Sequence, residues 1–399
     1  MELRRLRVAG PLFVYLILLM QGPRDKGTAM TGKTEAGTVR DFERGDIEAV
    51  AQLFQETFRK SKAPSPSLIA YLEEAFFDHP WAEPDIRSKV FAEAGGRVSG
   101  FIGVFPSRLE LDGRPLRAAF AGSMMVRNPK ENPLAGARLL RSFLAGPQDI
   151  SLTETANSTA LGMWQKAGHP ADPGYSMNWL RILRPASAAV EVLARRLRPA
   201  ALLRPFGRIA DRGSALVRMT PLRPAERSAS KITFRDVTRE QFGTALPALA
   251  LNYPLRPRWD DRSLGWFLRQ AEDKRNFGYP EWRVGFAPDG PPVAAYVYFA
   301  GPGEIGWLLG ALSAPNATPD LVDDLFAHAY EIGCSGIRGS GHPWLIPTLM
   351  SRKTIFYGRS FYVAQARDKS LLEPIRSGQA LISGLAGESW TRLIGDRFE

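Results

Sequence analysis

The sequence predicts an α/β protein with mixed (α+β) sheets, organised as two similar units in tandem with a basic helical linker between them. Three observations lead to this prediction. Short β-type runs bounded by Gly turns alternate with runs of helical period. The same order of elements occurs in residues 38–185 and again in residues 231–399, which indicates an internal repeat. Residues 186–230 differ from both units because they contain nine Arg and frequent Pro.

Composition narrows the functional classes. The chain has 399 residues, 44% of them hydrophobic, so it can bury substantial cores in two or three domains. A net charge of +11 suits phosphate-bearing ligands, nucleic acid or an anionic membrane. The single cysteine, Cys334, excludes an internal disulfide and a cysteine-based zinc cluster, and it fits a reducing cytosol. The four histidines show no metal-ligand spacing, so we expect no metal.

Residues 1–37 precede the first unit and leave two interpretations open. A basic start is followed by an apolar run of 13 residues, which is shorter than the about 20 residues that span a bilayer. The run is either an extension upstream of a start at Met30 or a signal peptide or membrane anchor. We therefore expect a cytoplasmic protein with possible membrane association through this run, followed by a polar linker.

The first unit, residues 38–185, is expected to begin with a strand at residues 39–42 and two helices. Asp46 stands at the N-cap position of the first helix, and apolar residues recur after it at helical spacing. Ser65 before Pro66 is typical of a helix start, and Pro80 would close this second helix.

The rest of the first unit is rich in strands. Three strands are predicted within residues 90–126, and Asp112-Gly113 predicts a hairpin turn between the last two. The remaining predicted elements are a helix at 132–144, a strand at 149–157, a short helix at 158–169 and a final strand of this unit at 174–185. This order predicts a mixed sheet with helices on both faces.

The second unit, residues 231–399, repeats this order loosely. A strand, two helices and three strands precede a helix that should end at Gly333, and a strand, a short helix and a closing strand follow. Residues 315–319 contain two Pro at the position where the first unit has its Gly/Ala helix entry, so we do not expect this half to hold a pyrophosphate in the same way.

The basic linker, residues 186–230, allows three interpretations. Its Ala/Leu positions fit short amphipathic helices that pack on a domain as a connector. Its arginines also fit weak contact with an anionic membrane. Nucleic acid is a less favoured partner because no aromatic residues are interleaved with the arginines.

Two motifs in the first unit resemble those of a known family. Residues 131–137 read Glu-Asn-Pro-Leu-Ala-Gly-Ala at a helix start, and residues 163–169 read Met-Trp-Gln-Lys-Ala-Gly-His at the end of the next helix. With them, residues 38–185 resemble the GNAT superfamily of acyl-CoA-dependent N-acetyltransferases, and the second half looks like a degenerate copy. The resemblance implies a sheet splayed open between its fourth and fifth strands, with acetyl-CoA or another acyl-CoA as co-substrate in the gap.

The resemblance also implies which residues hold the co-substrate. Asn157 would lie near the pantetheine, although it fits a helix cap equally well. Pro133 lacks an N–H donor, and Glu131 and Leu134 replace the basic residue and the first glycine of the family motif, which should weaken binding. The binding residues carried over are Met125 and Val126 for the pantetheine arm, Leu134, Ala135, Gly136 and Ala137 for the pyrophosphate, and Asn157.

The predicted chemistry is acyl transfer by direct attack of a primary amine on the thioester, with no covalent enzyme intermediate. Glu154, at the end of a strand beside the gap, is the predicted base that removes the amine proton. Trp164 stands where many family members have a proton-donating Tyr, so Tyr175 is the predicted substitute. The acceptor would be a small-molecule or peptide amine.

Two other functions stay open at this point. The departures at Glu131, Leu134 and Trp164 also fit a catalytically degenerate binding or scaffold protein that keeps the fold. The basic linker and the apolar run at the N-terminus fit a role at the membrane surface, in envelope or polysaccharide assembly.

Overall fold

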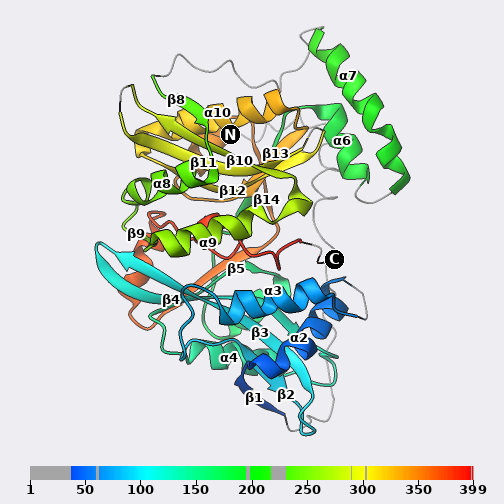
Figure 1. Ribbon diagram of the computed structural model, residues 1–399, viewed down its shortest axis with the longest axis vertical. Coiled ribbons are helices and arrows are strands. Elements are labelled where there is room, and N and C mark those ends of the chain that lie inside the picture. The colour runs from blue at the N-terminus through cyan, green and yellow to red at the C-terminus, as the bar shows by residue number, and fades with distance from the viewer. Residues whose placement is uncertain are drawn as a thin grey trace, which may run out of the picture.

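The computed structural model describes residues 37–59, 63–194, 198–216, 231–288, 290–301, 303–396 and 398. The predictions made for residues 1–36 and for part of the linker, 195–197 and 217–230, lie outside these described residues. Two mixed sheets lie one above the other along the long axis of the molecule (Figure 1). This arrangement agrees with the predicted fold class of α/β units on mixed sheets.

The first sheet has the order β1-β2-β3-β4-β5-β15-β6, with β9 added beside β3. Neighbouring strands are antiparallel except β4 and β5, which are parallel. Its strands are β1 (Thr38–Asp41), β2 (Lys89–Ala92), β3 (Val98–Leu111), β4 (Arg114–Val126), β5 (Ile150–Ala156), β6 (Ala171–Asp172), β9 (Leu255–Pro257) and β15 (Phe361–Ala366).

The second sheet has the order β14-β7-β13-β12-β11-β10-β8, and β12 and β13 form its parallel pair. Read from β8, it follows the same plan as the first sheet read from β1. That the second half is a duplicated and degenerate copy stays a prediction. Its strands are β7 (Met177–Ile182), β8 (Thr233–Asp236), β10 (Tyr279–Phe286), β11 (Pro292–Ala300), β12 (Ile305–Ser313), β13 (Gly336–Ser340) and β14 (Ile355–Gly358).

Each sheet includes strands from the other half of the chain: the first sheet takes β9 and β15, and the second sheet takes β7. The assignment of residues 174–185 to the sheet of the first unit was wrong, because β7 pairs with β13 and β14 in the second sheet. Strand β15, expected to close the second unit, pairs with β5 and β6 in the first. Local pattern shows that a segment is a strand, but its partner is chosen by long-range packing. The unit boundaries at 185/186 and 230/231 stay predictions.

Helices cover both faces of each sheet, as the alternating pattern predicted. Helices α4 and α5 pack on one face of the first sheet, and α10 and α11 pack on one face of the second. The helices are α2 (Ile47–Phe54), α3 (Pro66–Phe77), α4 (Ala135–Leu144), α5 (Ser158–Lys166), α6 (Pro185–Ala194), α7 (Arg204–Leu216), α8 (Arg239–Ala250), α9 (Asp261–Glu272), α10 (Thr318–Ile332), α11 (Ile346–Ser351) and α12 (Glu373–Arg376).

One large core joins the two halves. The remaining faces of both sheets, helices α2, α3, α8 and α9, and residues 380–393 all contribute to a single hydrophobic cluster. Helices α3 and α9 face each other across it, and Gln270 Nε2 donates to Glu74 Oε1 at 2.6 Å. The final stretch of the chain is therefore buried between the two sheets, although it belongs to neither.

Several local signals in the sequence are confirmed. Ser65 caps α3, and its hydroxyl accepts from the N–H of Leu68 at 3.3 Å. Asp112 and Gly113 both have positive φ in the turn between β3 and β4, the conformation that this dipeptide favours. Gly333 ends α10 in the left-handed region. Among the described residues no helix is long and apolar enough to cross a membrane.

Candidate functional site

The parallel strands β4 and β5 separate after a short paired stretch. They pair only from Ala118 with Ile150 to Phe120 with Leu152. Beyond this point β4 bulges against β3, because Ser123 and Met124 together oppose Ile102. Ser123 has a φ of 50°, which is uncommon for a residue other than Gly and occurs mainly at turns, bulges and functional sites. The open wedge that the family resemblance implied is therefore present in the first sheet.

A cavity of about 610 Å³ occupies this wedge, a size that suits an organic ligand. Its wall comes from the open ends of β4 and β5, the starts of α4 and α5, the turn after α2, and the last residues of the chain. The lining residues with polar side chains are Thr57, Arg59, Ser123, Asn132, Thr153, Thr155, Asn157, Thr159, Glu388 and Thr391.

The start of α4 meets the cavity at Gly136 and at the preceding Asn132 and Pro133. First-turn amides of a helix have no partner within the helix and favour anionic ligands. Ala135 is buried in the core, whereas Leu134 is 55% exposed and Ala137 is exposed. Of the four residues expected to hold a pyrophosphate, only Gly136 lines the cavity.

Three other predicted binding residues, Met125, Val126 and Asn157, line the cavity. Met125 is 2% exposed and also belongs to the core, so both interpretations of this position apply. Asn157 caps α5, and its Oδ1 accepts from the N–H of Ala160 at 2.9 Å. The buried Asn132 also lines the cavity, and its Oδ1 has no hydrogen-bond partner among the described residues.

Glu154 does not lie where the sequence suggested. Side chains alternate along a strand, so Thr153 and Thr155 line the cavity while Glu154 points to the opposite face of β5. There its carboxylate accepts backbone N–H groups of Gly384 at 2.7 Å, Glu388 at 3.0 Å and Ser389 at 3.2 Å. Glu154 thus anchors the end of the chain, and its placement does not favour a role as the base.

Tyr175 is also placed away from the cavity. Its side chain is 3% exposed, and its hydroxyl donates to the carbonyl oxygen of Ala380 at 2.7 Å and accepts from the N–H of the same residue at 3.2 Å. Burial raises the pKa of this hydroxyl above its usual range. Both observations describe a packing and hydrogen-bonding role rather than a proton donor.

Glu388 is the functional candidate that sequence reasoning missed. Its Oε1 accepts from the N–H of Glu154 at 3.0 Å, and from the N–H at 2.8 Å and the hydroxyl at 2.7 Å of Thr155. A Cβ at Gly122 would come within 2.5 Å of its Oε2, so the carboxylate bridges the separated strands. Among the described lining residues it is the only carboxylate.

The carboxyl group of Glu388 has a pKa near neutral pH. Burial, and to a lesser extent the neighbouring Glu154, raise its pKa from 4.5 to about 7. The two residues are joined by reciprocal hydrogen bonds, since each carboxylate accepts the backbone N–H of the other residue. A carboxylate with this pKa in a cavity can accept and return a proton at physiological pH.

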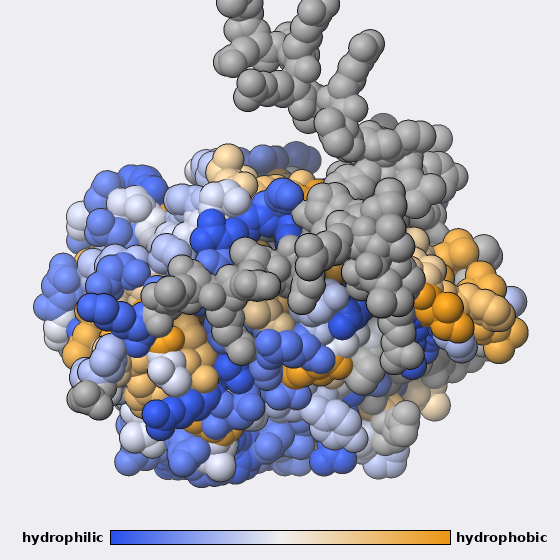
Figure 2. Space-filling model, turned by 90° about the horizontal axis from the view of Figure 1, so that it is seen from above, coloured by the Kyte–Doolittle hydropathy of each residue, from blue (hydrophilic) through white to orange (hydrophobic). Residues whose placement is uncertain are grey.

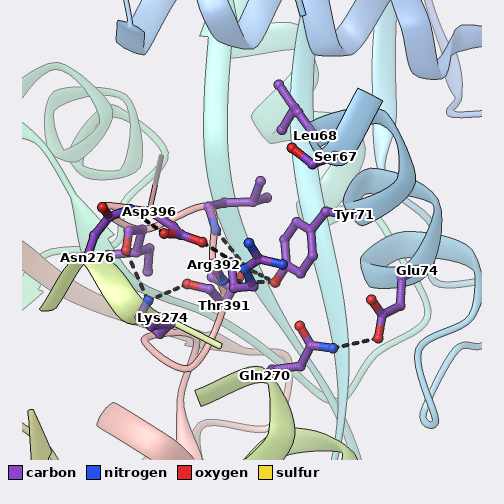
Figure 3. Close-up of polar contacts among 12 residues, drawn as sticks. Ser67, Leu68, Tyr71, Glu74, Gln270, Lys274, Asn276, Thr391, Arg392 and Asp396 are labelled. Atoms are coloured by element: carbon purple, nitrogen blue, oxygen red, sulfur yellow. Dashed lines mark hydrogen bonds and ion pairs between the residues drawn. The ribbon is translucent and has the colours of Figure 1, made fainter. Parts of the chain in front are cut away.

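The segment that carries Glu388, residues 384–396, is held by both halves of the chain (Figure 3). From α3, Tyr71 contacts Thr391 Oγ1 at 2.9 Å and accepts from the N–H of Arg392 at 2.8 Å. From the second half, the buried Lys274 donates to the carbonyl oxygens of Thr391 at 2.5 Å and Ile394 at 3.0 Å. We refer to residues 384–396 as the C-terminal segment.

Lys274 carries an amino group whose burial costs free energy of folding. It is fully buried, and burial lowers its pKa to about 7. The rings of Trp307 and Phe277, at 5.1 and 5.4 Å from Nζ, offset part of this cost. Beside Lys274, the side chains of Asn276 and Arg392 hydrogen-bond to Asp396 (Figure 3). The C-terminal segment is therefore held by several hydrogen bonds.

The wedge of the second sheet is filled by the chain itself. Strands β12 and β13 pair from Ile305 with Gly336 to Leu308 with Gly339 and then stop. Gly384, at a φ of 66°, packs directly against the carbonyl of Leu309 just beyond this point. The chain thus closes the second wedge with residues near 384 and continues into the first wedge with Glu388.

No family model and no curated protein matches this chain. It is similar in structure to a probable N-acyltransferase of Enterococcus faecalis V583, with a TM-score of 0.54 and 9% identity over 83% of this chain and 72% of that one. It is also similar to a GCN5-related N-acetyltransferase of Anabaena variabilis, with a TM-score of 0.53 and 9% identity over 83% of this chain and 73% of that one. A GCN5-related N-acetyltransferase of Kribbella flavida has a TM-score of 0.50 and 10% identity over 84% of this chain and 72% of its own. The chain therefore has the fold of GCN5-related N-acetyltransferases.

Proposed function

We propose that the protein is an N-acyltransferase that moves an acyl group from acyl-CoA to a primary amine by direct attack in the β4/β5 wedge. The observation that carries this proposal is a single cavity that combines open strand edges, a helix start and a carboxylate with a pKa of about 7. The fold similarity supports it. Acyl-CoA would supply the activated carbonyl group.

The residues of the wedge fit part of this ligand well. The open edge of β4 at Met125 and Val126 offers main-chain groups to an amide-rich arm. The helix start is a weaker match, since Pro133 has no N–H and Glu131 places a carboxylate nearby. We therefore expect Gly136 and its neighbouring amides to contact the diphosphate at modest affinity.

In the proposed reaction Glu388 takes the proton of the attacking amine. The nitrogen forms a bond to the acyl carbon, and the bond from this carbon to sulfur breaks. Glu388 then returns the proton to the departing thiolate, because an alkyl thiol such as that of Cys has a pKa of about 8.5, above that of Glu388. Cys334 is buried in the core of the second sheet, which is in keeping with attack without a covalent enzyme intermediate.

Binding of acetyl-CoA is the direct test of the proposal. At a concentration of 100 times Kd the ligand should stabilise the protein by about 2.7 kcal/mol, visible as a rise in Tm. Gly136→Asp should abolish the rise, because it places a carboxylate at the cavity wall. Gly162→Asp is the matched control, since Gly162 has open space around it and does not line the cavity.

Turnover is measured next as thiol release from acetyl-CoA with a panel of amines. Binding without release for any amine would assign the protein to the degenerate binding proteins instead. No stabilisation by any acyl-CoA would end the proposal altogether.

Tyr175→Phe separates the two roles that were considered for this residue. We expect a loss of about 1–3 kcal/mol in the free energy of unfolding, because the substitution leaves the backbone groups of Ala380 without their partner. Turnover should stay at the wild-type value when it is measured well below Tm. A fall in turnover at unchanged stability would restore Tyr175 as the proton donor.

A further inference from the structure

Helix α7 carries an apolar face that nothing in the described structure covers. Leu202 just before the helix, and Phe206 and Ile209 within it, are 79%, 68% and 64% exposed. Their spacing of four and three residues places them on one side of a helical surface. The apolar residues form a patch on the side of the molecule where α6 and α7 lie, at the right in Figure 2. We call these three residues the outer face of α7.

The opposite side of α7 is fixed against α6, so the exposure of the outer face follows from the packing. Asp211 accepts the N–H groups of Ala186 at 3.0 Å and Ser187 at 2.8 Å, at the start of α6. A Cβ at Gly207 would come within 3.2 Å of Ser187 Cα. Arg204 Nη2 also pairs with Glu191 Oε2 at 3.0 Å. These contacts orient α7 with its apolar side outward.

The segment that carries the outer face of α7 is strongly basic in sequence. Residues 195–212 contain six Arg and a single acid, Asp211, which is already engaged with α6. Arg204 and Arg208, two residues before and after Phe206, are exposed on the polar side of α7. An amphipathic helix with arginines on its polar side and Leu, Phe and Ile on the other is the pattern of a helix that lies in the interface of an anionic bilayer.

We propose that the outer face of α7 docks on an anionic lipid membrane. The arginines meet the headgroup phosphates, and Leu202, Phe206 and Ile209 enter the boundary of the acyl chains. Both halves of this chemistry are needed. Nucleic acid would use the arginines but leave the three apolar side chains in water, and an uncharged protein groove would use the apolar side chains without the arginines.

Vesicle sedimentation with the full chain tests the proposal. The probe is a vesicle of phosphatidylcholine and phosphatidylglycerol in a 3:1 ratio, compared with pure phosphatidylcholine. Wild type should bind the mixed vesicles, bind pure phosphatidylcholine at least about 10-fold more weakly, and lose affinity as NaCl rises from 0.1 to 0.5 M, since the Debye length falls from about 10 Å to about 4 Å.

The variant L202S/F206S/I209S should lower the partition constant on mixed vesicles at least about 10-fold at unchanged Tm. The matched control is L251S/M350S, which replaces two equally exposed apolar residues outside α7 and should bind like wild type. Arg195, Arg196 and Arg198 changed to Gln should weaken binding to mixed vesicles and not to pure phosphatidylcholine. All variants keep the apolar run at residues 8–20, so a loss assigns binding to α7.

Three results would overturn the proposal. One is equal binding of wild type and L202S/F206S/I209S, which would place the membrane contact elsewhere in the chain. Another is absence of vesicle binding together with a dimer that the triple variant converts to a monomer in light scattering, which would make this face a contact between copies. The third is displacement of vesicles by duplex DNA that binds wild type and the triple variant equally.

Discussion

Replacing Glu388 by Gln is expected to lower turnover by roughly 10²–10⁴-fold, the range in which general acid–base catalysis contributes. Gln keeps the shape and one oxygen that can accept the N–H groups of Glu154 and Thr155, so Tm should change little. It cannot take the proton of an attacking amine. The measurement is thiol release from acetyl-CoA at saturating amine, together with a melting curve of each variant.

Glu131→Gln is the control for this experiment, because Glu131 is an exposed carboxylate on the loop before α4 that does not line the cavity. It should leave kcat near the wild-type value when acetyl-CoA is also saturating. Retention of full turnover in Glu388→Gln, with normal binding of acetyl-CoA, would show that the proton leaves by another route.

The dependence on pH follows from the raised pKa of Glu388. Only the ionised carboxylate accepts a proton, so turnover should rise with pH through about 7, and this limb should vanish in Glu388→Gln. The contribution of Glu388 to the free energy of unfolding changes with pH in the opposite direction. Because folding raises the pKa from 4.5, the contribution of this group is fully present below pH 4.5 and is lost as pH rises through about 7. Urea unfolding across this range measures it.

Replacing Glu154 by Leu is expected to cost at least about 3 kcal/mol in the free energy of unfolding. The change leaves three buried N–H groups, those of Gly384, Glu388 and Ser389, without an acceptor, at about 1–3 kcal/mol each. The C-terminal segment should then detach first and become sensitive to proteases. Urea unfolding and limited proteolysis followed by mass spectrometry report the two effects.

Glu154→Gln separates anchoring from catalysis. It retains one carbonyl oxygen, so it should destabilise less than Leu and keep measurable turnover. It also removes a charge that helps to raise the pKa of Glu388, so the acidic limb of the pH profile should move to lower pH. Full loss of turnover in Glu154→Gln beside an active Glu388→Gln would instead make Glu154 the base, as the sequence suggested.

The start of α4 shows how far a motif can be followed without coordinates. The sequence located the helix start and the family resemblance implied the open wedge, and Gly136, Met125, Val126 and Asn157 all line the cavity. The same motif did not reveal that Leu134 and Ala137 are exposed to solvent. The direction of each side chain around a helix start depends on the angle at which the loop enters, and α4 packs against both the first sheet and α5.

Glu388 lies 234 residues from Glu154 in the chain, and no local pattern joins them. An acid within an otherwise apolar and aromatic stretch, Ser-Gly-Leu-Ala-Gly-Glu-Ser-Trp, was the one signal in its favour. Burying a carboxylate costs free energy of folding, so an acidic residue in an apolar stretch is a candidate functional group. The sequence alone did not show that it would be buried.

By itself, the sequence determined the type and order of most helices and strands, the turns at Asp112-Gly113 and Gly333, and the mixed-sheet fold class. These features arise from hydrophobic period and from backbone preferences of single residues, which act over a few positions. The sequence did not predict the short elements β6, β9, β14 and α12. Tertiary structure alone decided that β7 and β15 exchange sheets and that the chain end closes one wedge and brings Glu388 into the other. Those choices depend on which distant surfaces exclude water together, and a local pattern carries no information about its partner.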